Sequence, residues 1–332
     1  MNRYPPSPPI TVAAWRRAMR TIAVAVVTMV FAAFALGCEP RPPAPAVSPG
    51  VASVAPSVPA APSTAGLLVA DGGPIRITDE NAQLVDFAGP TNPVDRVSAA
   101  SGTVVAIAAG GILLQTRLDG SDRPSTWQEI RAPIGPAGGN RFPAVSPSGT
   151  DLVVATGALQ AASFELVVVD LATDTSRSIH IDRGLNGSPS WLGPRRIAVD
   201  AIQPNGAAAL VIINPASGEL SVPPIVATVI AATPDGRRLA VDDPKTGDVL
   251  VGDTDATGVG WAPGGPRRIQ GSDGAGIESL ALSAEGKRLA VVRRTGDHVA
   301  TIALLADGDR GWAAIGSVEI RGDHAVSIAW LR

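Results

Sequence analysis

The sequence predicts an all-β protein built from one four-stranded unit that is repeated around a ring. Three observations support this fold class. Glycine and proline are abundant, at 36 and 30 of 332 residues, which suits many short strands joined by turns. Short apolar runs alternate with tight turns at regular spacing from residue 66 onward. The sequence has no sustained helical periodicity.

The clearest repeat is a strand, a tight turn and a second strand. It occurs as FPAVSPSGTDLVVAT (142–156), SPSWLGPRRIAVDA (188–201), VIAATPDGRRLAVDD (229–243) and SLALSAEGKRLAVVR (279–293). A proline in the second turn position presets φ, and the glycine that follows tolerates a positive φ. A shorter version, SAASGTVVAIAA (98–109), fits the same pattern.

A third apolar strand and a weaker, alternating strand follow each pair, for example at 164–170 and 176–181. Four strands per unit, with buried inner strands and an alternating outer one, are typical of a propeller blade. The turn glycines Gly102, Gly149, Gly236 and Gly286 are 47, 87 and 50 residues apart, and the middle interval contains a further unit. The blades therefore have forty-odd residues.

The two ends of this region predict how the ring closes. The chain stops at a lone innermost strand, 327–330, while strands at 67–70, 74–77 and 83–87 lack an innermost partner. Pairing of the N- and C-terminal strands would complete a shared blade and protect the sheet edges. The continuous blades are expected at about 94–131, 142–182, 188–223, 227–270 and 278–321. The prediction is a six-bladed β-propeller over 66–332, with five or seven blades as alternatives.

Residues 1–37 have the pattern of an export signal. Arg16, Arg17 and Arg20 precede an apolar run of 17 residues, and Cys38, the only cysteine, follows directly. The motif Ala35-Leu36-Gly37-Cys38 resembles the lipobox of bacterial lipoproteins, with the leucine and the small residue exchanged. This resemblance implies that Cys38 is the lipidated first residue of the mature protein. The alternative is an uncleaved membrane anchor, and the export route, Sec or twin-arginine, is left open.

Residues 38–65 are rich in proline and alanine and predict an extended tether that does not fold. Removing residues 1–37 takes the formal net charge from −3 to −7, because the segment holds four arginines and no acid. An acidic mature domain argues against nucleic acid as a partner, since that partner needs a basic surface.

The segments SPSG, TPDGRRLAV and SAEGKRLAV resemble the repeats of TolB-like propellers, a branch of the WD40-like class. The resemblance covers about 66–332 and lacks the folded domain that precedes the propeller in TolB itself. It implies a binding or scaffolding role in the cell envelope. The lipobox-like motif implies that the protein is lipid-anchored on the extracytoplasmic face of the membrane. The expected partner is an envelope protein or peptide, or a glycan.

The search for catalytic or metal-binding motifs gives little. The three histidines, His180, His298 and His324, have no HxH or HExxH spacing, and no G-x-S-x-G motif is present. The stretch 253–258 begins like a calcium loop, but position twelve is Gly264 instead of glutamate. We therefore expect no metal, no cofactor and no enzymatic activity. The alternative is a secreted polysaccharide lyase or hydrolase that uses His324 and a nearby acid at the channel mouth.

A ligand is expected at the face where loops lead into the innermost strands and join the second strands to the third, because function usually lies on such loops. Mixed charge at a channel mouth suits a peptide end or a sugar. The predicted mouth residues are Asp95, Arg96, Asn140, Arg141, Arg183, Asn186, Glu278, Asp323 and His324. A second ring is expected from Asp71, Asp200, Asp242, Asp243, Arg293 and Arg294.

Overall fold

The computed structural model describes residues 66–118, 126–132, 134, 140–157, 162–203, 206–223, 225–255, 257–258, 260–269, 276–296 and 298–331. The predicted signal peptide (1–37), the tether (38–65) and Cys38 lie outside the described residues. Within those ranges the chain forms strands and two short 3-10 turns, η1 (Ala109–Gly111) and η2 (Gly193–Arg195). No helix in this part of the chain has the length and apolarity needed to cross a membrane.

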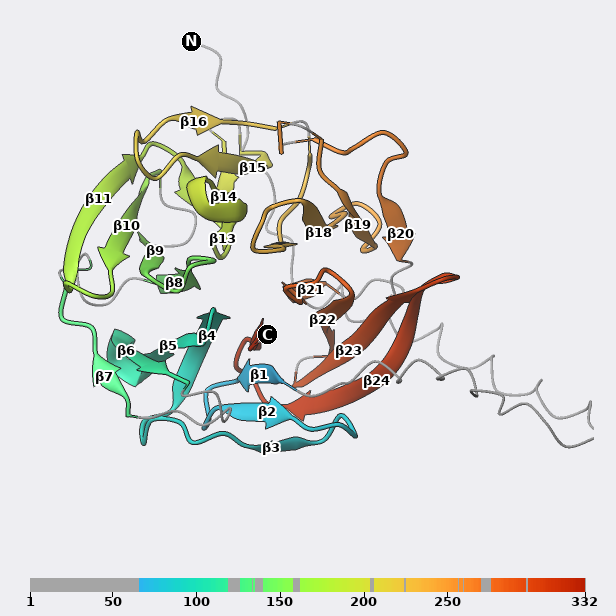
Figure 1. Ribbon diagram of the computed structural model, residues 1–332, viewed down its shortest axis with the longest axis horizontal. Helices are drawn as coiled ribbons and strands as arrows, with labels where there is room; N and C mark the ends of the chain where they lie inside the picture. Colours follow the sequence, from blue (N-terminus) through green and yellow to red (C-terminus); the bar gives the residue numbers. More distant parts are fainter. Residues whose placement is uncertain are drawn as a thin grey trace, which may run out of the picture. The chain divides into compact units, whose positions relative to one another are not determined.

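The strands form six antiparallel sheets arranged around a central axis, which confirms the six-bladed β-propeller (Figure 1). We number the sheets as blades in chain order. Blade 1 holds β4 (Val94–Ala100), β5 (Thr103–Ala108), β6 (Ile112–Arg117) and β7 (Gln128–Glu129); blade 2 holds β8 (Asn140–Val145), β9 (Asp151–Gly157), β10 (Phe164–Asp170) and β11 (Thr175–Ile181); blade 3 holds β12 (Gly184–Leu185), β13 (Ser190–Trp191), β14 (Ile197–Ile202), β15 (Ala208–Ile213) and β16 (Leu220–Ser221). Blade 4 holds β17 (Ile230–Ala232), β18 (Arg238–Asp242), β19 (Val249–Asp253) and β20 (Arg267–Ile269); blade 5 holds β21 (Ile277–Leu282), β22 (Arg288–Gly296), β23 (Val299–Gly308) and β24 (Gly311–Arg321); blade 6 holds β25 (Ser327–Trp330), β1 (Leu67–Ala70), β2 (Arg76–Thr78) and β3 (Leu84–Asp86).

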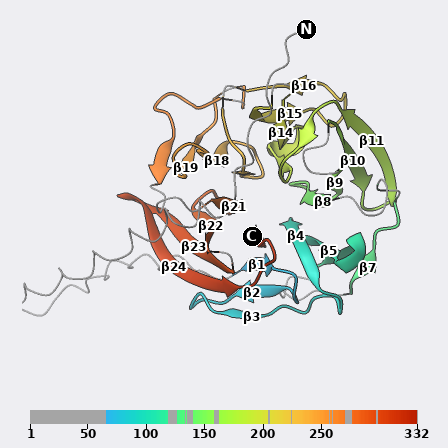
Figure 2. The same ribbon diagram turned by 180° about the vertical axis from the view of Figure 1, so that it is seen from behind.

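Blade 6 is built from both ends of the described chain, as the sequence predicts. β25 pairs antiparallel with β1, with Trp330 opposite Leu67 and Ser327 opposite Ala70. The backbone N–H of Leu331 extends the ladder by donating to Gly66 O at 2.9 Å. Seen from behind, the C-terminal end lies beside β1 at the centre of the ring (Figure 2).

Each blade packs its apolar faces against its two neighbours. The buried apolar side chains group into six clusters, and each cluster joins two adjacent blades. Val326, Ile328 and Trp330 belong to the cluster between blades 5 and 6, while Ala329 and Leu331 belong to the one between blades 6 and 1. The C-terminal strand therefore contributes to two cores at once, because alternate side chains of a strand point to opposite faces.

The turns between first and second strands also hold the blades together. Gly236 adopts φ +70 and donates its N–H to Thr233 O at 2.8 Å, as the turn prediction requires. A Cβ on Gly236 would lie 2.8 Å from Gly193 N, so the turn of blade 4 rests directly on the turn of blade 3. A side chain at Gly236 is excluded both by backbone conformation and by this close approach.

The innermost strand of blade 3 departs from the prediction. The sequence predicts the innermost strand at 188–191, but the structure has two short pieces, β12 and β13, with residues 186–189 between them. Pro189 has no N–H to donate to the ladder, which explains why the pairing is interrupted here.

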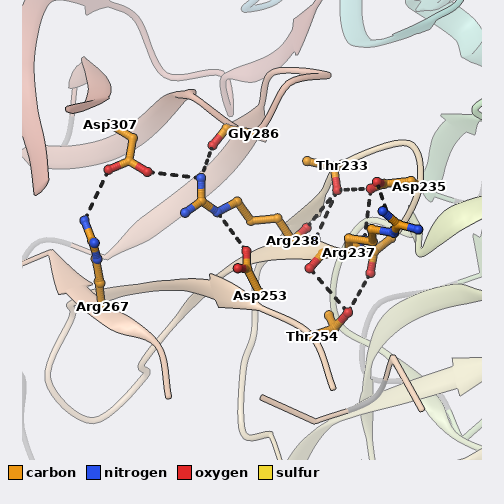
Figure 3. A network of polar contacts seen from close by, with 10 residues as sticks. Thr233, Asp235, Arg237, Arg238, Asp253, Thr254, Arg267, Gly286 and Asp307 are labelled. Carbon is orange, nitrogen blue, oxygen red and sulfur yellow. Dashed lines mark hydrogen bonds and ion pairs between the residues drawn. The ribbon is translucent and has the colours of Figure 1, made fainter. Parts of the chain in front are cut away.

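A polar network joins blades 4 and 5 on the side of these turns (Figure 3). Arg238 Nη1 donates to Gly286 O at 2.8 Å and lies 3.1 Å from Asp307 Oδ2. Its Nε forms an ion pair with Asp253 at 3.3 Å, and Arg267 contacts Asp307 at 3.4 Å. Because Arg238 already has partners from two blades, we assign this network to blade packing and not to ligand binding.

Two tryptophans at the end of innermost strands make the same contact between blades. Trp191 Nε1 donates to Ala144 O at 2.9 Å, and Trp330 Nε1 donates to Ala281 O at 3.0 Å. Both indoles are buried, so water cannot replace the lost donor if the nitrogen is removed.

We predict that Trp191→Phe and Trp330→Phe each lower the free energy of unfolding by about 1–2 kcal/mol, because each leaves a buried carbonyl without its donor. Urea unfolding monitored by circular dichroism measures this. The control is Trp127→Phe, since Trp127 Nε1 donates to Ala88 O at 2.9 Å near the surface, where water can substitute. An equal loss in all three variants would contradict the prediction.

Candidate functional site

The innermost strands of the six blades surround a cavity of about 760 Å³ along the ring axis. Each of these strands pairs with its own blade on one side only, so its other backbone edge has no strand partner. Side chains of the neighbouring blade bind some backbone groups on these edges, as Ser98 Oγ does for Val145 N at 2.9 Å, and the remaining groups can bind water or a ligand. Small side chains leave the space open: the lining includes Ser98, Ala99, Ala100, Ser188, Ser190, Ala231, Ala232, Ser279, Ala281, Ser327 and Ala329.

The two ends of this cavity differ in charge. At the end formed by the tight turns, the lining consists of uncharged residues such as Ser101, Pro147, Pro234 and Ala284. At the other end, where loops lead into the innermost strands, the described lining includes three charged residues: Arg96, Asp200 and Glu278. We call this end the charged mouth. It is the face that the sequence predicts for ligand binding.

Arg96 and Glu278 lie on either side of the segment that leads into β25. Both residues lie at a β-bulge of an innermost strand. The register of β4 shifts between Val94 and Arg96, and the register of β21 shifts between Ile277 and Ser279. Bulges of this kind re-aim side chains at sheet ends. Arg96 Nη1 donates to Ala325 O at 3.4 Å, and Glu278 Oε2 accepts from Val326 N at 3.4 Å.

Other groups complete the surroundings of these two residues. Glu278 forms an ion pair with Arg294, which also donates to His324 O at 2.7 Å. Arg96 stacks over Phe142 at 5.3 Å from the ring centre, and burial lowers its pKa against the opposing effect of nearby carboxylates. Both residues therefore have partners within the chain, and both help to hold the closing strand in place.

Asp200, within β14, differs from both of them. Its side chain is buried, Oδ2 accepts a hydrogen bond from Asn186 Nδ2, and Oδ1 has no hydrogen-bond partner among the described residues. Burial raises the pKa of this carboxyl to about 7, the Asn186 hydrogen bond opposes the shift, and the Asp242 carboxylate adds to it.

The predicted mouth residues divide into three groups. Arg96, Asn186 and Glu278 line the cavity. Asn140 and Arg141 belong to β8, but their side chains lie outside the described part of the structure. The remaining four, Asp95, Arg183, Asp323 and His324, are not part of the described lining.

Two of these four residues, Asp323 and His324, make contacts outside this lining. The Asp323 carboxylate pairs with His298, and this contact lowers the pKa of Asp323. The His324 ring lies over Gly72, where a Cβ would be only 2.5 Å from it. Among the residues expected in a second ring, Asp200 is the one that the cavity lining includes. Asp71 instead pairs with Arg76, and Arg293 Nη1 donates to Gly247 O at 2.7 Å.

Local contacts account for the stretch that begins like a calcium loop. Asp255 Oδ1 accepts hydrogen bonds from the N–H and the hydroxyl of Thr257, at 3.0 and 2.6 Å, so the stretch that begins like a calcium loop closes on itself. In the described ranges there is no group of three or more His, Cys, Asp or Glu side chains that could hold a metal ion.

Comparison with known proteins supports the fold. No family model matches the sequence, and no curated protein matches it significantly. A putative TolB from Agrobacterium tumefaciens aligns with a TM-score of 0.53 and 12% identity, over 82% of this chain and 100% of that chain. A chain of a nidogen/laminin complex aligns with a TM-score of 0.55 and 12% identity, over 81% and 99% respectively. The TolB-like resemblance is thus confirmed at the level of the propeller fold.

We predict that Asp200→Asn removes a pH dependence of stability. The carboxyl has a pKa of about 7 in the folded chain and about 3.9 when unfolded, so the folded state binds more protons between these values. Wild-type stability from this group is therefore present below pH 4 and is lost as the pH rises through 7. Each pKa unit corresponds to about 1.4 kcal/mol, so the loss amounts to a few kcal/mol.

Urea unfolding at pH 4.5 and pH 8 measures this effect. Asparagine resembles the protonated acid, so the variant should be close to wild type at pH 4.5 and more stable than wild type at pH 8. Asp309→Asn, at an exposed side chain, is the control. A stability difference between Asp200→Asn and wild type that stays constant with pH would show that Asp200 titrates normally.

Proposed function

We propose that this chain is a membrane-anchored lipoprotein on the extracytoplasmic face of the membrane and that its propeller binds an envelope protein or peptide at the charged mouth. The observation that carries the proposal is the axial cavity of about 760 Å³, whose described charged groups gather at one end. The alternative partner of the same site is a glycan.

The lining of the cavity supports a peptide or another polar ligand. Innermost strands with one unpaired edge offer backbone donors and acceptors, which extended peptides use when they bind. Small apolar and hydroxyl side chains give room along the axis, and charged groups at the mouth give orientation. A rigid ring of packed blades keeps this arrangement preformed, which lowers the entropic cost of binding.

Binding is favoured over catalysis because of the groups at the mouth. The described lining holds no histidine or cysteine, and Glu278 is already engaged by Arg294 and by the backbone of Val326. His324, which the enzymatic alternative requires as the acid or base, lies over Gly72 outside this lining. A general acid and a general base must both lie close to the bond that reacts. His324 and an acidic side chain of the described cavity lining are not brought together in this way.

The anchor is proposed from the sequence. Cys38 follows an apolar run and a lipobox-like motif, and residues 38–65 supply the reach between the membrane and the propeller.

We predict that Cys38→Ser abolishes incorporation of labelled palmitate and leaves the protein at precursor mass, because the sulfur is the acylation site. Metabolic labelling and intact-mass measurement on cells that export the protein test this. Ser48→Ala, in the tether, should label like wild type. Mature protein that starts at Cys38 and carries no acyl chain would contradict the proposal.

We also predict that a photo-crosslinking phenylalanine in place of Ser188, an exposed residue of the cavity lining, captures a discrete envelope partner in cells. The same residue in place of Ser217, which is exposed outside the lining, should not capture that partner. Mass spectrometry identifies the adduct. The same adduct from both positions, or none from Ser188, would overturn binding at the mouth.

A further inference from the structure

Asp200 has an equivalent residue in the next blade, and the comparison shows what is unusual about it. The segments Ile197–Asp200 and Leu239–Asp242 occupy the same positions of the second strand, each with Ala-Val before the aspartate. Asp242 accepts hydrogen bonds from the N–H and the hydroxyl of Thr228, at 2.6 and 2.5 Å, and from Val229 N at 2.7 Å. It therefore fixes the loop that leads into β17.

At Asp200 these donors are missing. The loop before β13 gives the carboxyl one donor, Asn186 Nδ2, and leaves Oδ1 without a partner among the described residues. A buried acceptor in this state costs free energy that a hydrogen bond would recover. The fold does not need a carboxyl at this position, because Ala70, Ala155 and Val292 stand there in three other blades.

The surroundings of the Asp200 carboxyl favour a donor that carries a positive charge. A Cβ on Gly187 would lie 3.2 Å from both the Asp200 Cβ and Thr228 O, so a backbone acceptor lies on the same side as the carboxyl. Asp242 is the charged group that acts on Asp200, and its effect is to repel negative charge there. Asp200, Asn186, Gly187 and Thr228 line the cavity, and Asp242 accepts a hydrogen bond from the Thr228 hydroxyl.

The number of unpaired acceptor atoms at the Asp200 carboxyl determines which kind of cation fits the site. A guanidinium binds a carboxylate best through both oxygens, but Oδ2 is already used by Asn186. A divalent metal needs several ligands, and no group of three or more such side chains occurs in the described part of the chain. An ammonium group has three donors that need no planar arrangement, so it can bind Oδ1 together with nearby carbonyl groups.

We infer that Asp200 is the binding point for a primary ammonium group of the ligand that enters the channel at the charged mouth. This inference rests on the proposed function and adds the chemical class of the ligand. An ammonium bound at Oδ1 would pair with the carboxylate form of Asp200 and give the unpaired acceptor its donor. The bound ligand is thereby oriented with its amine toward blade 3 and the rest of the molecule along the cavity.

The experiment is an NMR titration of the exported propeller with three amines: N-acetyl-lysine amide, alanyl-alanine amide and glucosamine. They distinguish a lysine side chain, a peptide N-terminus and an amino sugar as the source of the ammonium. We expect at least one to bind, with its N-acetylated form binding at least tenfold more weakly. Asp200→Asn should lose binding by at least tenfold, whereas Asp309→Asn should bind like wild type.

A second measurement uses the wild-type protein alone. With a pKa of about 7, about one-tenth of the Asp200 carboxyl is ionised at pH 6 and about nine-tenths at pH 8. The affinity for N-acetyl-lysine amide, whose amine stays charged over this range, should therefore rise about tenfold from pH 6 to pH 8.

Three outcomes would overturn the inference: no binding of any amine, equal binding of amines and their acetylated forms, or unchanged binding in Asp200→Asn. If crosslinking from position 188 still captures a partner, such an outcome rejects the ammonium site and leaves the proposed function standing. If crosslinking also fails, the proposed function is rejected together with the ammonium site.

Discussion

The pairing of β25 with β1 is the constraint on which the rest of the structure depends. A four-stranded sheet of this chain has apolar side chains on both faces and can bury them only against two neighbours. In an open array the first and last blades would each expose one face. The closing strand removes this problem with four residues, because its alternate side chains enter the cores on both sides while its backbone completes the ladder of blade 6. The charged groups Arg96 and Glu278 hold the segment just before it, so part of the charge at the mouth also secures the ring.

Ring closure determines where a ligand can bind. Six innermost strands converge on one axis, and each leaves one backbone edge without a strand partner. Large side chains on these strands would fill the axis, but serine and alanine recur along it, and a cavity of about 760 Å³ results. Away from the axis, Arg238 forms ion pairs with Asp253 and Asp307 that join blades 4 and 5, so its charge is already paired (Figure 3). The axis therefore offers unpaired polar groups and space together.

Most of the fold was predictable because it is encoded locally and repeatedly. Each tight turn and its flanking apolar strands mark one blade, and the lone strand at 327–330 marks the closure. The site was less predictable. The order of the strands determines on which face of the propeller a loop lies, but it does not determine where the side chains of that loop point. Asp323 and His324 lie on the expected face, yet one binds His298 and the other covers Gly72. The bulges that aim Arg96 and Glu278 arise from pairing with β5 and β22, which no local pattern marks.

Asp200 and Asp242 also show that local sequence does not determine the contacts of a side chain. Their local sequences are nearly identical, so a reading of the second strands alone treats them as equivalent. The difference lies in the preceding loops: Thr228 and Val229 supply three donors to Asp242, whereas Asn186 supplies one to Asp200. The first carboxylate is satisfied by the fold, and the second is buried at a cost that the fold does not recover. The blade does not need the Asp200 carboxyl, and the described residues give its Oδ1 no hydrogen-bond donor. A ligand can supply that donor.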